Sequence, residues 1–302
     1  MYREFLEYLS SFMDKEDIKI NEPMSKHTSF RVGGPAKIFL IVHSEEVLSR
    51  ILIEVKERNL PYFMLGNGSN LLVSDQGYDG VMLYLGEEFA RIEVKGTGIR
   101  AGAAAFLGKV ARKALEEELT GLEFAAGIPG SLGGGVVMNA GAYGGELSQV
   151  VTKVRAMNTD GEVVILEKEE LLLGYRTSVF KKGSYVILEV FMELRKGDKQ
   201  EILGKMDEYT KARMEKQPLE YPSAGSTFKR PEGYFAGKLI MEAGLRGYQV
   251  GGAQVSEKHC GFVINKGNAT ATDIRILMRD VAKKVKEQFG VDLEAEVILL
   301  GE

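Results

Sequence analysis

Two uncharged, glycine-rich stretches, residues 65–71 and 127–141, carry residue types that can bind phosphate groups through the backbone. They read LGNGSNL and GIPGSLGGGVVMNAG. Gly and Asn readily adopt positive φ, so successive N–H groups can converge on an anion, and Ser69 and Asn70 add side-chain donors. Neither stretch has the lysine of a P-loop. Together they could hold a large polar ligand, such as a pyrophosphate flanked by flat rings, but tight turns and close packing explain Gly and Asn equally well.

A third glycine pattern, GTGIRA at residues 96–101, formally matches the dinucleotide-binding fingerprint G-x-G-x-x-G/A. A Rossmann unit also has an acidic residue about 20 positions later, at the end of a second strand. Here that region, Glu116–Glu118, lies within a predicted helix whose apolar positions include Leu107 and Val110. We therefore expect two strands joined by a glycine turn and followed by a helix.

The rest of the pattern predicts the helices and strands that position these loops. Ser44 is expected to cap an amphipathic helix, which is followed by a short apolar strand leading into Gly66. An Asp160-Gly161 turn separates two further strands, and a long charged helix ends before Pro218. Helices are expected over 2–13, 44–60, 198–217 and 270–290, single strands over 61–66, 184–197 and 291–300, and strand pairs over 30–42 and 151–167.

The composition is that of an ordinary globular protein, with 44% hydrophobic and 27% charged residues among 302. This length predicts about two domains. A net charge of −4, with both signs interspersed, argues against nucleic acid or an anionic membrane as a partner. The charged N-terminus lacks the apolar run of a signal peptide, and one cysteine, Cys260, suits a reducing compartment. We expect a cytoplasmic protein without a metal site or an obligate protein partner.

Five motifs, in the same order, resemble those of the UDP-N-acetylenolpyruvoylglucosamine reductases. They are LGNGSNLLV, GIPGSLGGGVVMNAGAYGGE, GYRTSVFK, PSAGSTFKRP and LEAEVILLG, and the resemblance runs from Asn21 to Gly301. The family consists of flavoenzymes that complete UDP-N-acetylmuramate in peptidoglycan synthesis. The resemblance implies an α+β fold, with a two-part FAD-binding region of the vanillyl-alcohol-oxidase (PCMH) type followed by a smaller α/β substrate-binding domain.

The resemblance also implies a division of the chain. The first FAD-binding subdomain is expected over residues 1–88, the second over 89–199 and the substrate-binding domain over 200–302. Only TSVFKKGS separates Arg176 from the strand at Tyr185, where the longer form of the family carries an insertion with a tyrosine that covers the substrate. The chain therefore resembles the shorter, type II form, and what covers its substrate is open.

FAD and NADPH are the cofactors that the resemblance implies. FAD is expected to bind noncovalently, because no histidine stands where relatives of this flavin fold attach it. Glycine would let backbone N–H groups approach the pyrophosphate and the flavin ring while charge is kept away. The implied FAD-binding residues are Leu65, Gly66, Asn67, Gly68, Ser69, Asn70, Leu71, Gly127, Ile128, Pro129, Gly130, Ser131, Gly133, Gly134, Asn139, Ala140 and Gly141.

Arg176, Ser226 and Glu296 are the catalytic residues that the resemblance implies. Hydride addition to the vinyl carbon of an enolpyruvyl ether leaves an enolate, which a guanidinium such as that of Arg176 can bind through two parallel bonds. Ser226 matches the proton donor, and Glu296 matches a third residue that stabilises the enolate. From the residues alone, Arg176 is more simply a solvated loop arginine and Ser226 a turn serine that bonds its own backbone.

The implied partner is a small molecule, UDP-N-acetylglucosamine enolpyruvate. Candidates for contact with its diphosphate or sugar are Arg213, Lys229, Lys238 and Gln254, each of which could equally be an ordinary surface residue. Two alternatives are a different oxidoreductase on the same flavin fold, such as an oxidase of small alcohols, and a nucleotide-binding module without catalysis. Neither explains why Arg176, Ser226 and Glu296 coincide at motif positions.

Overall fold

The structure, a computed structural model, describes residues 2–301 and divides into two compact units. Each unit has its own buried hydrophobic cluster and combines segments that are distant in the sequence. The three-part division at residues 88 and 199 remains a prediction. The first unit contains the described chain up to Ile20, with Ile38–Gly66 and Gly80–Ala212, and the second contains Asn21–Lys37, Asn67–Asp79 and the described chain from Arg213.

A four-stranded sheet with the order β1-β2-β5-β3 leads into the first glycine-rich loop. Strand β3 runs parallel to β5 and ends at Leu65, directly before Gly66. Helix α2 begins as predicted, because the Ser44 hydroxyl accepts a hydrogen bond from the Val47 N–H at 3.2 Å. The bounds are β1 Ile18–Pro23, β2 Pro35–Val42, β3 Tyr62–Leu65, β5 Tyr78–Leu85, α1 Tyr2–Leu9 and α2 Glu45–Glu57.

The predicted strand pair over residues 30–42 is wrong in its first half. Only β2 forms, and its neighbours are β1 and β5. The Gly34 N–H donates to the Ser74 carbonyl at 2.8 Å, and the Gly34 carbonyl accepts from the Met24 N–H at 3.1 Å. A Cβ on Gly34 would lie 2.2 Å from the Asp75 carbonyl oxygen. This glycine therefore permits two backbones to approach closely instead of forming a hairpin turn.

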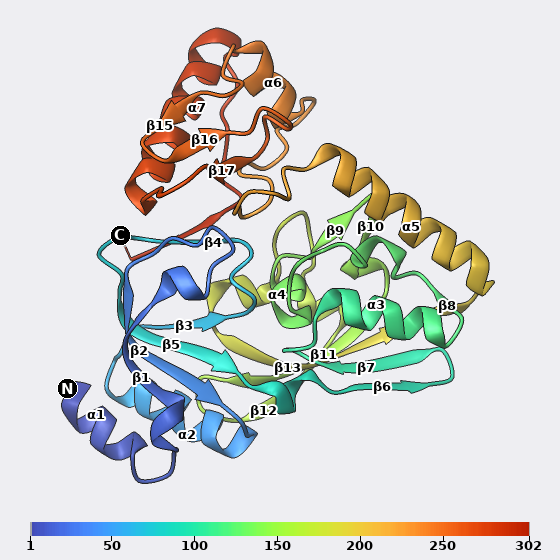
Figure 1. Ribbon diagram of the computed structural model, residues 1–302. Coiled ribbons are helices and arrows are strands. Elements are labelled where there is room, and N and C mark those ends of the chain that lie inside the picture. Colours follow the sequence, from blue (N-terminus) through green and yellow to red (C-terminus); the bar gives the residue numbers. More distant parts are fainter. Residues whose placement is uncertain (1, 302) are drawn as a thin grey trace. The chain divides into compact units, whose positions relative to one another are not determined.

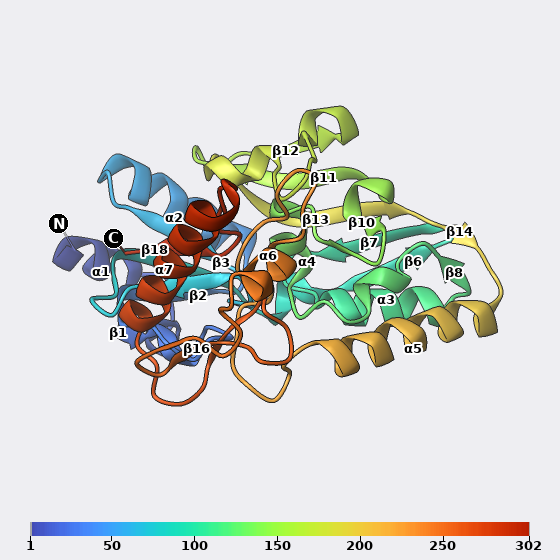
Figure 2. The same cartoon turned by 90° about the horizontal axis from the view of Figure 1, so that it is seen from above.

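A five-stranded antiparallel sheet with the order β12-β11-β13-β7-β6 supports the second glycine-rich stretch, whose helix α4 packs against β7 and β13 (Figure 2). The GTGIRA pattern forms the turn between β6 and β7, where Gly96 has a φ of 65°. Helix α3 follows, so the prediction of two strands and a helix is confirmed. The bounds are β6 Ile92–Lys95, β7 Gly98–Gly102, α3 Leu107–Glu116, β8 Leu119–Thr120, α4 Leu132–Val137, β9 Gly141–Ala142, β10 Gly145–Glu146, β11 Val151–Asn158, β12 Val163–Glu167, β13 Tyr185–Glu193, β14 Arg195–Lys196 and α5 Lys199–Lys216.

The second unit contains α6, α7 and the three-stranded antiparallel sheet β15-β16-β17 (Figure 1). Helix α7 agrees with the prediction, because Thr270 and Asp273 form a capping box at its start and Gly290, with a φ of 72°, ends it. Its buried residues include Ile274 and Leu277. The bounds are β4 Leu71–Val73, α6 Ala236–Glu242, β15 Gln249–Val250, β16 Ala253–Val255, β17 Val263–Asn265, α7 Ala271–Phe289 and β18 Ile298–Leu300.

Helix α1 is shorter than the predicted range of 2–13. The Ser10 and Ser11 hydroxyls donate to the Leu6 and Tyr8 carbonyls at 2.8 and 2.7 Å, in addition to the backbone N–H groups of the same residues. The N–H groups of Ser11 and Phe12 donate to carbonyls only three residues earlier, those of Tyr8 and Leu9, so the regular α-helical pattern ends here. No helix within residues 2–301 combines the length and apolar character needed to cross a membrane. Short 3₁₀ helices connect the other elements at Lys15–Asp17, Met24–Lys26, Glu87–Ala90, Glu123–Ala125, Leu147–Gln149, Lys168–Leu171 and Val179–Lys182.

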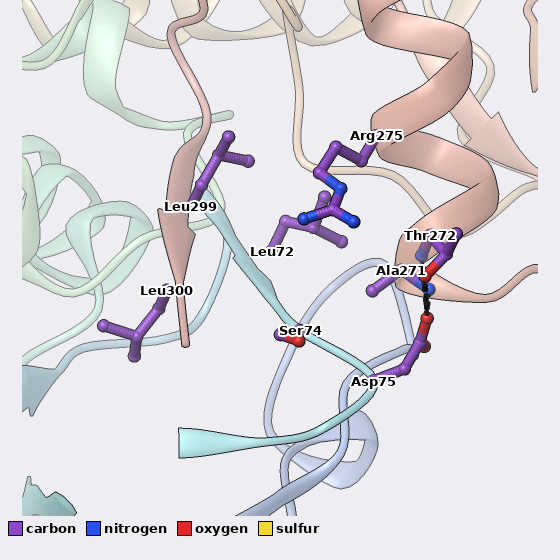
Figure 3. Close-up of a pocket in the computed structure, with 8 residues that line it drawn as sticks. All are labelled: Leu72, Ser74, Asp75, Ala271, Thr272, Arg275, Leu299 and Leu300. Carbon is purple, nitrogen blue, oxygen red and sulfur yellow. Dashed lines mark hydrogen bonds between the residues drawn. The ribbon is translucent and has the colours of Figure 1, made fainter. Parts of the chain in front are cut away.

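Asp75 joins the Asn67–Asp79 segment to the start of α7 (Figure 3). Its carboxylate accepts hydrogen bonds from the Ala271 N–H at 2.8 Å, the Thr272 N–H at 2.8 Å and the Thr272 hydroxyl at 2.6 Å. Partial burial raises the pKa of Asp75, but the bonds from Thr272 and Ala271 outweigh it, and the pKa lies below its ordinary value. Figure 3 shows Arg275 and Leu72 lining a shallow pocket beside this contact.

Asp75→Asn is expected to lower the free energy of unfolding at neutral pH by about 1 kcal/mol. The carboxylate accepts from two N–H groups at the start of α7, whereas the amide of asparagine is uncharged and has only one acceptor oxygen. The lowered pKa makes this contribution fully present above the pKa of the unfolded chain, and it is lost as the pH falls through the folded-state pKa. Urea unfolding should therefore show a difference between wild type and variant that narrows from about pH 7 towards about pH 3.

The matched control is Gln76→Ala, which removes the neighbouring exposed side chain. It should leave stability unchanged at both pH values. A loss in Asp75→Asn that is the same at both pH values would contradict the role assigned to the carboxylate.

Candidate functional site

The two glycine-rich stretches meet in the first unit at Gly66 and Ser131. A Cβ on Gly66 would lie 2.6 Å from the Ser131 hydroxyl oxygen. Ser131 is buried, and its hydroxyl accepts a hydrogen bond from the Gly134 N–H at 3.3 Å, which caps α4. The tertiary structure therefore brings together at Gly66 and Ser131 two stretches that lie about sixty residues apart in the sequence. This proximity agrees with both interpretations, a shared ligand and close packing.

Close packing within the protein explains three of the six glycines in the second stretch. A Cβ on Gly133 would lie 2.9 Å from the Ala103 Cβ, and one on Gly135 would lie 2.9 Å from the Leu107 Cδ1. A Cβ on Gly141 would lie 2.5 Å from the Gly145 carbonyl oxygen. Several N–H groups are also already used within the protein. Those of Gly130, Leu132, Gly133 and Gly135 donate to the carbonyls of Ile128, Ala105, Ala103 and Ser131. Close packing therefore accounts for Gly133, Gly135 and Gly141. Gly134, in contrast, is exposed.

Asn139, one of the predicted FAD-binding residues, has a fully buried side chain that binds within the protein. Its exposed fraction is 0% and its φ is 42°. Its Nδ2 donates to the Gly174 carbonyl at 3.2 Å, and its Oδ1 accepts from the Ser148 N–H at 2.9 Å. The side chain therefore fastens the second glycine-rich stretch to the turn that carries Arg176.

Arg176 lies at the tip of a two-residue turn. Gly174 and Thr177 exchange backbone hydrogen bonds of 3.1 and 3.2 Å around it. Arg176 itself has a φ of 55°, a left-handed conformation that costs a residue with a Cβ about 1–3 kcal/mol. Its guanidinium carbon lies 5.1 Å from the centre of the Tyr175 ring, a cation–π contact that sequence reasoning missed. The Ser178 hydroxyl donates to the Val137 carbonyl at 2.8 Å and anchors the turn to α4.

In the second unit, the loop of Asn67–Asn70 continues the first glycine-rich stretch and is tightly held. A Cβ on Gly68 would lie 1.9 Å from the His27 carbonyl oxygen, and the Gly68 carbonyl accepts from the Ser29 N–H at 3.1 Å. Within residues 2–301, the backbone N–H groups of Gly68, Ser69 and Asn70 donate no hydrogen bond. Such N–H groups in an uncharged loop suit an anionic group of a ligand.

Three hydrogen bonds bring the Ser226 and Glu296 segments to this loop. The Asn70 Nδ2 donates to the Glu296 carbonyl at 3.0 Å, and the Ile298 N–H donates to the Asn70 carbonyl at 3.0 Å. The Glu296 N–H donates to the carbonyl of Thr227, the residue after Ser226, at 2.9 Å. Thr227 is itself almost completely buried, and only its position beside Ser226 could have pointed to it from the sequence.

The predicted strand over residues 291–300 is wrong over most of its length. Only Ile298–Leu300 forms a strand, β18, which runs parallel to β4. Before it, Ala295 makes a single bridge with Phe228, and the Glu296 carbonyl accepts from the Asn70 side chain. In this segment Glu294 is exposed, whereas Val297 is buried.

The polar candidates of the second unit differ in their surroundings. Ser226 is exposed, whereas the Lys229 side chain is 19% exposed and forms an ion pair with Glu294, which is 73% exposed. The Arg213 Nε donates to the Gln217 Oε1 at 3.0 Å, and the Lys238 ammonium lies 3.7 Å from the Glu242 carboxylate. These contacts are of kinds that also occur on ordinary protein surfaces.

Gln254 differs from these candidates because it is a buried polar residue with an unused acceptor. Its exposed fraction is 7%, and its Nε2 donates to the Gly247 carbonyl at 3.3 Å. Within residues 2–301 its Oε1 has no hydrogen-bond partner. Buried polar atoms are rarely left unpaired, so this oxygen is suited to a donor on a ligand.

Comparison with known proteins gives two matches to family models and full-length relatives. Residues 36–167 match a model described as FAD binding domain, and residues 217–300 match the UDP-N-acetylenolpyruvoylglucosamine reductase, C-terminal domain. The UDP-N-acetylenolpyruvoylglucosamine reductase of Lachnoclostridium phytofermentans is 52% identical, over 100% of this chain and 99% of that protein. The one from Clostridioides difficile is 50% identical over 97% of each chain. This chain belongs to the UDP-N-acetylenolpyruvoylglucosamine reductase family.

Solved structures support the same family and the expected fold. The UDP-N-acetylenolpyruvylglucosamine reductase of Thermus caldophilus is 37% identical and superimposes with a TM-score of 0.83, over 94% of this chain and 100% of that one. Phl p 4.0202, a glucose dehydrogenase, is 12% identical with a TM-score of 0.50 over 65% of this chain and 44% of that one, which indicates shared fold alone. The predicted α+β fold with an FAD-binding region and a substrate-binding domain is confirmed.

Gly66→Ala is expected to weaken FAD binding about tenfold, because overpacking costs about 1–3 kcal/mol and the new methyl group displaces the Ser131 hydroxyl from Gly134. The dissociation constant can be measured by titrating the flavin-free protein with FAD and following flavin fluorescence.

The double variant with Ser131→Ala removes the hydroxyl that the methyl group would meet. It should bind FAD more tightly than Gly66→Ala alone. Equal affinities of the single and double variants would show that the contact between Gly66 and Ser131 does not control the loop.

Proposed function

We propose that this chain is an NADPH-dependent flavoprotein reductase that converts UDP-N-acetylglucosamine enolpyruvate to UDP-N-acetylmuramate in peptidoglycan precursor synthesis. The observation that carries the proposal is identity of about half the residues to UDP-N-acetylenolpyruvoylglucosamine reductases over the whole chain. Matches to both the FAD-binding and the C-terminal family models support it. The reaction would take place in the cytoplasm, where nucleotide-linked sugars and NADPH are available.

The residues of the glycine-rich loops fit noncovalent FAD. The N–H groups of Gly68, Ser69 and Asn70 are unused within residues 2–301, and the loop carries no charged side chain. Oxygen atoms of a pyrophosphate would accept from these donors. In the second stretch, the exposed Gly134 beside Ser131 leaves room for a flat ring system, while the buried glycines shape the backbone below it. When bound, FAD supplies the hydride for the vinyl carbon of the substrate.

Arg176, Ser226 and Glu296 are the residues to which we assign the remaining chemistry. The Arg176 guanidinium would bind the substrate carboxylate and stabilise the enolate that hydride addition produces. Glu296 would assist this stabilisation, and the Ser226 hydroxyl would donate the proton to the carbon next to the carboxylate. The exposure of Ser226 and the hydrogen bond that holds Glu296 beside Thr227 support this assignment.

Gln254, Lys229, Arg213 and Lys238 are proposed to contact the UDP-sugar. The unpaired Gln254 Oε1 is an acceptor, so it suits a hydroxyl or N–H of the sugar or base, not a phosphate oxygen. Lys229 and Arg213 suit the diphosphate by charge. The chain also resembles the shorter form of the family, which lacks the tyrosine-bearing insertion between Arg176 and Tyr185.

The proposed function is tested by separating the two half-reactions. The purified protein should be yellow and should lose its flavin absorbance when NADPH is added under anaerobic conditions. Addition of UDP-N-acetylglucosamine enolpyruvate should then restore the absorbance with formation of UDP-N-acetylmuramate. Reoxidation by oxygen but not by this substrate would favour an oxidase, and a purified protein that binds no FAD would refute a flavoprotein.

Ser226→Ala is expected to reduce flavin normally with NADPH but to reoxidise it with substrate about 10²–10⁴-fold more slowly, because general acid catalysis is lost. Stopped-flow absorbance measures both rates. Ser223→Ala is the matched control, since it removes a hydroxyl from the same loop without removing the proposed donor. Near-normal reoxidation by Ser226→Ala would remove this residue from the mechanism.

A further inference from the structure

Glu296 is held through both polar groups of its backbone. Its N–H donates to the Thr227 carbonyl at 2.9 Å, and its carbonyl accepts from the Asn70 side chain at 3.0 Å. The first bond restricts rotation on the N-terminal side of the Cα atom, and the second restricts it on the C-terminal side. Because φ and ψ are both constrained, the direction of the Cα–Cβ bond is set. The side chain that carries the Glu296 carboxyl group therefore extends from a backbone whose position is fixed.

The hydrogen bond from the Asn70 side chain to the Glu296 carbonyl lies just outside the backbone pairing of β4 with β18. Strands β4 and β18 are parallel, with Leu71 opposite Ile298, and the pairing begins only at those residues. Glu296 lies two positions before β18, outside the pairing of β4 with β18. The Asn70 amide supplies the donor, while its own carbonyl accepts from the Ile298 N–H at 3.0 Å. One residue thus holds the chain on both sides of Val297.

Asn70 can do this because its loop is itself fixed. The Gly68 carbonyl accepts from the Ser29 N–H at 3.1 Å, and no side chain larger than hydrogen fits between Gly68 and the His27 carbonyl oxygen. The same loop presents the unused N–H groups that we assign to FAD. A shift of the loop would therefore move the proposed flavin contacts and Glu296 together.

We propose that Asn70 is a positioning residue that sets the location of the Glu296 carboxyl group relative to the FAD-binding loop. The inference rests on the proposed function, in which Glu296 stabilises the enolate. We assign Asn70 a role through Glu296, because an N–H of its amide donates to the Glu296 carbonyl. Loss of the amide frees that carbonyl, and the carboxyl group samples positions away from the developing charge.

Asn70→Ala should therefore slow flavin reoxidation by UDP-N-acetylglucosamine enolpyruvate about ten- to hundredfold, as is typical when a supporting hydrogen bond is lost. Because Asn70 lies in the proposed FAD-binding loop, both rates are measured at saturating FAD. The readout is the rate of reoxidation relative to the rate of flavin reduction by NADPH in the same variant, which should fall about tenfold or more. Stopped-flow absorbance gives both rates in the complete enzyme.

Asn265→Ala is the matched control. Its Nδ2 also donates to a backbone carbonyl of the same unit, that of Phe30, at 3.0 Å, but it has no hydrogen bond to Glu296. This variant should lose thermal stability without a selective loss of reoxidation. If both variants slow the two half-reactions equally, Asn70 has only a structural role and the inference is overturned.

The double variant with Glu296→Ala separates positioning from a direct role. If Asn70 acts through the carboxyl group, Asn70→Ala should slow reoxidation by less than about twofold when that group is already absent. Multiplicative losses in the double variant would overturn the inference. A wild-type protein whose reduced flavin does not react with the substrate would instead refute the proposed function, so the two failures are distinguishable.

Discussion

In each of the two units, one asparagine amide joins a glycine-bearing loop to the backbone beside a residue that we propose to be catalytic. In the first unit Asn139 holds Gly174, two residues before Arg176. In the second unit Asn70 holds Glu296 itself. A hydrogen bond from a side chain to a carbonyl outside a regular ladder fixes a loop that could otherwise adopt several conformations. These two contacts therefore fix the backbone beside the residues that we propose to be catalytic.

The glycines serve this arrangement in two different ways. At Gly68, Gly133 and Gly141 the space that a Cβ would need is already filled by the protein, so these glycines let backbones approach closely. Their destabilising effect on local structure is offset by the contacts that they permit. Only where N–H groups are unused, as at Gly68–Asn70, does the backbone itself suit a ligand. A glycine-rich loop can thus be a packing element and a binding element at once.

The two glycine-rich stretches carry no charged residue, and the charged side chains of two candidate residues are restrained by contacts. The cation of Arg176 lies on a turn with a left-handed residue at its tip and faces the Tyr175 ring, and that of Lys229 pairs with Glu294. Neutral loops can approach the electron-rich phosphates and flavin through dipoles without fixing a full charge beside the ring. Full charges are then available for the substrate carboxylate and diphosphate, which we propose as their partners.

The sequence alone determined the features that depend on neighbours in the chain. Helix α2 with its Ser44 cap, helix α7 with its Thr270 and Asp273 box, and the turn between β6 and β7 follow from local bonds and from hydrophobic periodicity. The order of five motifs also pointed to the family. Tertiary structure decided the contacts between residues that are distant in the sequence. Asn70 and Glu296 are 226 positions apart, and Gly34 lies against the backbone of Asp75, which belongs to a different segment of the chain. No local sequence pattern indicates to which distant carbonyl an amide side chain will donate, so only the folded chain shows these hydrogen bonds.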